Sequence, residues 1–154
     1  MRTLQDLSSD ITSHGGTTLI VTAEPASFLP EMRKITGYSG AAINDPENSL
    51  VPLVKERYGL EIAVSEKKGY VNGMAQPGIL ILRGGKTGNG GREGEVLEKW
   101  AIVPSTMNLG GASDRPDLIQ VWDNVKAKME GKGVVHGVYK KMGIVGTLWN
   151  KVFG

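Results

Sequence analysis

The segment GMAQPGILILRGGK, residues 73–86, holds the pattern that decides the fold of this 154-residue sequence. Its centre, GILILR (78–83), is an unbroken apolar run of the kind that forms a buried strand. The glycine-rich stretch that follows contains a Gly-Lys-Thr triplet, as phosphate-binding loops do, but the loop glycine expected at position 80 is Leu80, and no helix start follows the triplet. We therefore predict a hairpin between 78–83 and 95–103, with a lid over a ligand as the alternative.

Composition is that of a soluble single-domain protein. The chain is 40% hydrophobic and 22% charged, and its net charge is +2, which gives no strong attraction to nucleic acid. No apolar run approaches the roughly 20 residues that span a bilayer. Residues 1–16 contain no apolar signal-peptide core, which predicts a cytoplasmic protein without a transmembrane segment.

Helical and strand patterns alternate along the chain, which predicts the α/β class. Glycines and prolines separate the segments, and Asp45-Pro46-Glu47 has the composition of a helix start. The helices are expected at 1–13, about 27–36, about 45–58 and from 113–116 to about 129, and the strands at 17–23, 40–44, 78–83 and 95–103.

Two long stretches resemble the peroxiredoxin-like branch of the thioredoxin superfamily, the AhpC/TSA type close to the peroxiredoxin-like 2 proteins. They are TTLIVTAEPASFLPEMRKITGYSGAAINDPENSLVPLVKERYG (17–59) and LEKWAIVPSTMNLGGASDRPDLIQVWDNVKAKM (97–129). The resemblance implies a thioredoxin-like three-layer α/β/α domain with a mixed sheet over residues 1–130. It also implies that Pro77 is the proline, usually cis, that precedes a core strand.

The sequence contains no cysteine. Disulfides, thiolate metal sites and thiol nucleophiles are therefore excluded for these 154 residues. In the family that the chain resembles, a peroxidatic cysteine lies at the start of the first helix, which here begins at Met1. Attack on a peroxide needs a thiolate, so we expect neither peroxidase nor disulfide reductase activity, and no cofactor or metal.

The family's first strand, which would lie in the sheet between 17–23 and 78–83, is also missing. Without it, two central strand edges would lack hydrogen-bond partners. The gap could be filled by the chain's own segment 133–141, by a segment swapped from a second subunit or by a rearranged sheet; a longer natural chain is the remaining alternative. The missing strand favours a homodimer.

Residues at the family's active-site face are the candidate ligand-binding residues. Gln76 and Pro77 come from the proline motif that precedes the core strand. Tyr70 and Trp100 could stack on a planar ligand, and Gln76 or Asn108 could orient a carbonyl or hydroxyl group. Arg115 could bind a carboxylate. A structural role is the alternative for each, and the catalytic residues stay unknown. The candidates are Tyr70, Gln76, Pro77, Trp100, Asn108 and Arg115.

Structural roles are favoured over catalytic ones for both histidines. His14 lies at the end of the first predicted helix, where it interacts favourably with the helix dipole. His136 is expected at the surface or in a packing contact. No histidine–carboxylate group has metal-ligand spacing.

Residues 131–154 read as a Gly-rich linker followed by an amphipathic helix with lysines beside its apolar face. Packing on its own domain or on a second subunit is favoured for this helix over a membrane surface.

Three functions remain open. The favoured one is a cysteine-free, non-redox protein that binds a small organic molecule or a protein partner on a thioredoxin-like scaffold. The second is a cofactor-independent isomerase, cyclase or lyase that acts on a small organic substrate. The third is an inactive, degenerate relative of the peroxiredoxins. Fold alone does not choose among them.

Overall fold

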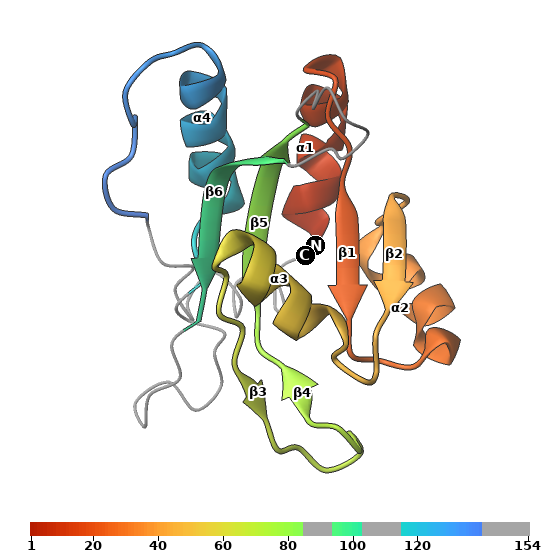
Figure 1. Ribbon diagram of the computed structural model, residues 1–154. Helices are drawn as coiled ribbons and strands as arrows, with labels where there is room; N and C mark the ends of the chain where they lie inside the picture. Colours follow the sequence, from red (N-terminus) through yellow and green to blue (C-terminus); the bar gives the residue numbers. More distant parts are fainter. Residues whose placement is uncertain (85–93, 103–114, 140–154) are drawn as a thin grey trace, which may run out of the picture. The chain divides into compact units, whose positions relative to one another are not determined.

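The computed structural model describes residues 1–84, 94–102 and 115–139 (Figure 1). This part of the chain is mixed α/β, which confirms the predicted class. Its elements in chain order are α1 (Arg2–Ser13), β1 (Leu19–Thr22), a 3₁₀ turn (Ala26–Phe28), α2 (Leu29–Thr36), β2 (Ala41–Asn44), α3 (Leu50–Tyr58), β3 (Val64–Ser65), β4 (Met74–Ala75), β5 (Gly78–Arg83), β6 (Glu95–Ala101) and α4 (Leu118–Met129).

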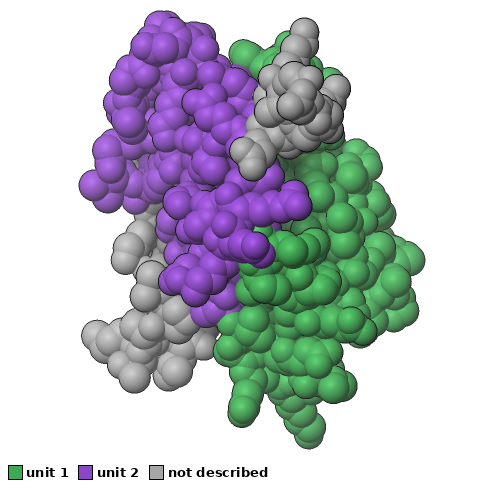
Figure 2. Space-filling model, in the orientation of Figure 1, with its two compact units in different colours: residues 1–53, 64–75 green, residues 54–63, 76–154 purple. Residues whose placement is uncertain are grey.

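The chain divides into two compact units, coloured separately in Figure 2. Unit 1 contains Met1–Leu53 and Val64–Ala75, and unit 2 contains Val54–Ala63 and Gln76–Gly154. Unit 1 therefore holds α1, α2, the parallel pair β1–β2 and the hairpin β3–β4. Unit 2 holds the hairpin β5–β6 and α4.

The described strands form three separate two-stranded sheets. β1 and β2 are parallel, with Leu19 opposite Ala41 and Val21 opposite Ile43. β3 and β4 pair antiparallel, as do β5 and β6, which confirms the predicted hairpin. The glycine-rich loop of that hairpin lies largely outside the described residues. A single mixed sheet of the thioredoxin type is not formed by the strands described.

The first two helices begin and end where the sequence predicts. α1 ends at Ser13, and Gly15 follows with φ 73°, a conformation that glycine adopts at little cost. α2 carries Pro30 in its first turn, where no intrahelical N–H bond is lost. Gly37, with φ 71°, caps its other end.

The starts of the later helices correct the sequence-based boundaries. α3 begins at Leu50 and not near Pro46, because the Asp45 carboxylate accepts from the Leu50 N–H at 2.8 Å and caps the helix there. α4 begins at Leu118, and its cap is Asp117, whose carboxylate accepts from Ile119 N at 2.9 Å. In both cases an aspartate that precedes the helix accepts a hydrogen bond from a backbone N–H of the first helical turn, which stabilises the start of the helix.

Most of the buried apolar side chains belong to unit 2, where α4 packs on β6. That core comprises Leu60, Leu97, Ile102, Val121, Trp122, Val125 and Ala127. In unit 1 the buried aromatic residue is Tyr38, whose hydroxyl bonds Thr18 Oγ1 at 2.9 Å and Ala41 O at 3.1 Å. The exposed large apolar side chains of unit 1 include Leu19, Phe28 and Ile35.

Residues 133–139 form no strand, so this part of the 133–141 segment does not fill a sheet position. Asn124, a buried residue of α4, holds it instead. The Asn124 amide donates to His136 O at 2.9 Å and to the Tyr139 hydroxyl at 3.1 Å. Its carbonyl accepts from Val135 N at 3.0 Å and His136 N at 2.8 Å.

Candidate functional site

Polar residues gather at the carboxyl ends of β1 and β2 in unit 1. β1 leads into Glu24 and β2 ends at Asn44, and the Asn44 amide donates to Glu24 O at 2.9 Å. Both strands are parallel, so their carboxyl ends share one edge, the usual place for sites in α/β folds. We call Glu24, Asn44, Asp45, Asn48, Tyr70 and Asn72 the polar cluster.

Tyr70 and Glu24 form the ionisable pair of the cluster. The Tyr70 hydroxyl donates to Glu24 Oε1. That hydrogen bond, followed by burial, raises the pKa of Tyr70 above its ordinary 10.0, because the carboxylate favours the protonated phenol. The pair is half-buried. The phenol and the carboxylate are therefore both partly accessible to solvent.

Asp45 has a structural role in the cluster. Its carboxylate accepts from Ser49 Oγ at 2.6 Å, Ser49 N at 2.9 Å and Leu50 N at 2.8 Å. Burial tends to raise the pKa of Asp45, but these hydrogen bonds outweigh it and lower the pKa below 3.8. The carboxylate already occupies the N-terminus of α3, which is therefore no site for another anion.

Asn48 joins the α3 loop to the β3–β4 hairpin. Its amide donates to Asn72 O at 2.8 Å and to Gly73 O at 3.1 Å, while its own backbone is left-handed with φ 55°. Its Oδ1 atom is buried without a hydrogen-bond partner among the described residues. The strained backbone and the two donated bonds show that this residue fixes the hairpin to the loop.

The predicted ligand-binding residues are divided between the two units. Tyr70 belongs to unit 1 and the polar cluster. The other described candidates belong to unit 2, and Asn108 lies outside the described residues. Glu24, Asn44, Asn48 and Asn72 were not among the predicted site residues, although Glu24 directly follows the predicted strand 17–23 and Asn44 is the last residue of the predicted strand 40–44.

In unit 2, Pro77 and Trp100 lie at the same end of the β5–β6 hairpin. Pro77 O accepts from Ile102 N at 3.1 Å, and Trp100 is opposite Ile79. The Gln76–Pro77 peptide bond is trans and not cis. Gln76 N donates to Ala63 O at 2.8 Å, and Arg115 is exposed.

The histidines take part in pairs at helix surfaces. His14 caps α1, with Nδ1 2.8 Å from Asp10 O. His136 Nε2 lies 3.4 Å from Asp123 Oδ2. Both positions agree with structural roles. Within residues 1–84, 94–102 and 115–139, no group of three or more carboxylates and histidines is placed to hold a metal ion.

One face of the β1–β2 pair is apolar and exposed. Leu19 is 52% exposed, Val21 47% and Ile43 42%. Val21 lies opposite Ile43 in the parallel register, so these side chains share one face. The two strands have the sequences LIVT and AAIN and contain no charged residue. We call this surface the β1–β2 face.

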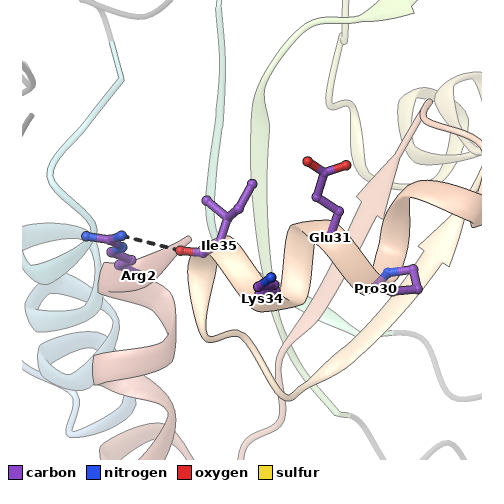
Figure 3. Close-up of a pocket in the computed structure, with 5 residues that line it drawn as sticks. All are labelled: Arg2, Pro30, Glu31, Lys34 and Ile35. Atoms are coloured by element: carbon purple, nitrogen blue, oxygen red, sulfur yellow. Dashed lines mark hydrogen bonds between the residues drawn. The ribbon is translucent and has the colours of Figure 1, made fainter.

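A depression of about 660 Å³ lies between α1 and α2 (Figure 3). It is lined by Arg2, Pro30, Glu31, Lys34 and Ile35. An Arg2 guanidinium nitrogen donates to Ile35 O at 3.4 Å. Cations and a carboxylate occur together there around an exposed Ile35 side chain, which favours no single class of ligand.

Among the helices that the structure describes, none has the length and apolar character to cross a membrane. Comparison with protein-family models, curated proteins and solved structures finds no match for this chain.

Proposed function

We propose that this chain is a cysteine-free, peroxiredoxin-like binding protein of the cytoplasm that works as a homodimer and has no peroxidase activity. Its two units would represent a thioredoxin-like α/β/α arrangement from which one strand is missing. The observation that carries the proposal is the exposed β1–β2 face, whose protein partner is a second copy of this chain.

The strand edges support self-association. β1 and β2 pair with each other and with no third strand among the residues described. Their outer edges therefore carry backbone N–H and C=O groups available to another strand, and neither strand carries the charges that usually prevent such pairing. A two-fold axis beside β1 would place the two β1 strands antiparallel, which satisfies both edges equally.

Apolar contact and strand pairing together are sufficient for a weak dimer. Pairing of the β1 edges places Leu19 and Val21 of one copy beside those of the other on the same face. Full burial of a Leu or Val side chain contributes about 1.5–3 kcal/mol, so covering the exposed half of each contributes about 1 kcal/mol at most, and the four side chains offset an association cost that starts near 4 kcal/mol. About four hydrogen bonds between the two strands, at about 1–1.5 kcal/mol each, then leave about 4–6 kcal/mol. We expect a Kd between about 50 µM and 1 mM.

Sedimentation equilibrium from about 10 µM to 1 mM spans that range of Kd and tests the proposal. Leu19→Lys places a charge on the face and should leave a monomer throughout. The matched control is Ile119→Lys, because Ile119 is 50% exposed on α4, in the other unit. A monomeric parent protein would refute the proposal, and so would a dimer that tolerates Leu19→Lys.

A second candidate function rests on the Tyr70–Glu24 pair. A phenol beside a carboxylate at the carboxyl ends of parallel strands suits a small organic molecule with hydroxyl or amine groups. The same pair would supply the acid and base of a cofactor-independent isomerase, cyclase or lyase.

Gentle native mass spectrometry of the purified protein would detect a retained small molecule. The expected result is a bound mass that disappears in Tyr70→Phe and persists in Tyr58→Phe, which removes a hydroxyl elsewhere. A bare protein in every sample would leave no support for this candidate and would favour an inactive relative or the dimerisation role.

A further inference from the structure

The turn of the β3–β4 hairpin carries a fully exposed apolar side chain and two exposed lysines. Residues 66–73, EKKGYVNG, form this turn, which we call the hairpin tip (Figure 1). Val71 is 99% exposed. Lys67 and Lys68 are exposed as well, and Glu66 is the one acid in the tip.

The conformation of the tip is held by hydrogen bonds. Within the turn, Tyr70 N donates to Lys67 O at 3.0 Å and Gly73 N donates to Tyr70 O at 3.2 Å. Gly69 has φ 95°, which favours glycine at that position. These bonds give the turn a defined shape in which Val71 points to solvent.

Bonds from the neighbouring loop of unit 1 brace the tip further. The Asn48 amide donates to the carbonyls of Asn72 and Gly73, and the Asn72 amide donates to Pro46 O at 3.2 Å. A buried, left-handed asparagine thus holds in place a turn whose outermost side chain touches nothing. Val71 is therefore presented on a preorganised support.

The tip carries net positive charge. The Tyr70 hydroxyl engages Glu24, and Lys67 Nζ lies 5.6 Å from the centre of the Tyr70 ring. The charges of Lys67 and Lys68 outweigh that of Glu66 within the tip, and the Glu24 carboxylate outside the tip is bonded to the Tyr70 hydroxyl. A partner that offers negative charge around an apolar region would complement the two exposed lysines and Val71.

We propose that the hairpin tip docks on an anionic lipid surface, with Val71 entering the interface and Lys67 and Lys68 on the headgroups. A convex tip with one aliphatic side chain is far too small for a specific protein interface, which buries about 1,000 Å² or more. A bilayer interface needs no complementary pocket, because it accepts small apolar groups by partition.

The contributions of the tip can be estimated. Each lysine near an anionic leaflet strengthens binding about fivefold. Insertion of Val71 strengthens it about tenfold. One tip alone therefore binds weakly, with a signal at millimolar lipid that falls as salt screens the lysines.

Co-sedimentation with lipid vesicles tests the proposal. The probe is phosphatidylcholine vesicles with about 30 mol% phosphatidylserine, compared with phosphatidylcholine alone, at low and at high salt. The parent protein should bind the anionic vesicles at low salt. Val71→Ser should weaken that binding about tenfold, and the double variant Lys67→Gln/Lys68→Gln about 25-fold.

Matched variants identify the tip as the cause. Val138 is 90% exposed elsewhere in the chain, so Val138→Ser removes an equally exposed valine and should bind as the parent does. Lys132→Gln removes an exposed lysine of unit 2 and should weaken binding fivefold at most. Circular dichroism should show that all these surface variants are folded.

Three results would overturn the proposal. They are no binding to anionic vesicles, equal binding to neutral vesicles, and binding that Val71→Ser and Val138→Ser change to the same extent. The third would assign membrane affinity to another part of the chain. The test does not depend on dimer formation, since Leu19→Lys leaves the tip intact and should still bind.

Discussion

Replacing Asn124 with leucine should release residues 133–139 from α4. The Asn124 side chain makes four hydrogen bonds to this segment, to Val135, His136 and Tyr139. Leucine has a similar volume and keeps the apolar contacts of the buried position, but it forms none of these bonds. The helix itself should stay folded, because Val121, Trp122 and Val125 still form its buried face.

The magnitude follows from the hydrogen bonds. Four bonds at about 0.5–1.5 kcal/mol each give a loss of about 4 kcal/mol. Part of this is recovered, because Val135 and its neighbours are exposed and their freed backbone groups bond to water. We expect the free energy of opening this segment to fall by about 2–3 kcal/mol, which is about a 30- to 150-fold faster exchange.

Amide hydrogen exchange at Val135 and His136 is the assay, because both amides are bonded to Asn124. Asp123→Ala is the control on the same helix. It removes the partly exposed 3.4 Å contact to His136 and should change exchange about threefold at most. The reasoning would be refuted by unchanged exchange in Asn124→Leu, or by an equal effect of Asp123→Ala.

Three further predictions concern unit 1. Gly40→Ala should destabilise the protein by about 1–3 kcal/mol in urea unfolding, because the added Cβ would overlap the Tyr38 hydroxyl. Because the pKa of Tyr70 is higher in the folded state than its ordinary 10.0, the protonated phenol stabilises the fold below pH 10.0. This contribution is lost as pH rises through the pKa of the folded state, so Tyr70→Phe should flatten the alkaline decline in the free energy of unfolding. Because the pKa of Asp45 is lower in the folded state than 3.8, its carboxylate stabilises the fold above pH 3.8. This contribution is lost as pH falls through the pKa of the folded state, so Asp45→Asn should flatten the decline in the free energy of unfolding at acid pH.

Each of these has a nearby control. Gly133→Ala adds a Cβ with no atom within 4 Å and should be neutral in urea unfolding. Tyr58→Phe should keep the alkaline decline in the free energy of unfolding, which Tyr70→Phe should flatten. Glu47→Gln changes an exposed acid close to Asp45 and should keep the decline in the free energy of unfolding at acid pH. Equal behaviour of a variant and its control would contradict the corresponding prediction.

Local sequence signals predicted the regular elements well, because they depend on neighbouring residues. The β-branched run at 17–23 became β1, and Gly37 ended α2 as its freedom at positive φ requires. The apolar run GILILR paired with the strand that follows it. The β3–β4 hairpin was missed because its strands are two residues long, too short for an alternating pattern.

The sequence by itself determined most of the helices and the longer strands, the β5–β6 hairpin and the absence of a thiol in these 154 residues, since these depend on local pattern or on an absent residue type. Tertiary structure alone decided which side chains meet. Tyr70 reaches Glu24 across 46 residues of sequence, and Asn48 reaches Asn72 across 24. Such contacts depend on how strands pair and loops fold back, and no periodicity in the chain encodes them. For the same reason, the position of Tyr70 beside Glu24 in the polar cluster could not be predicted from the sequence.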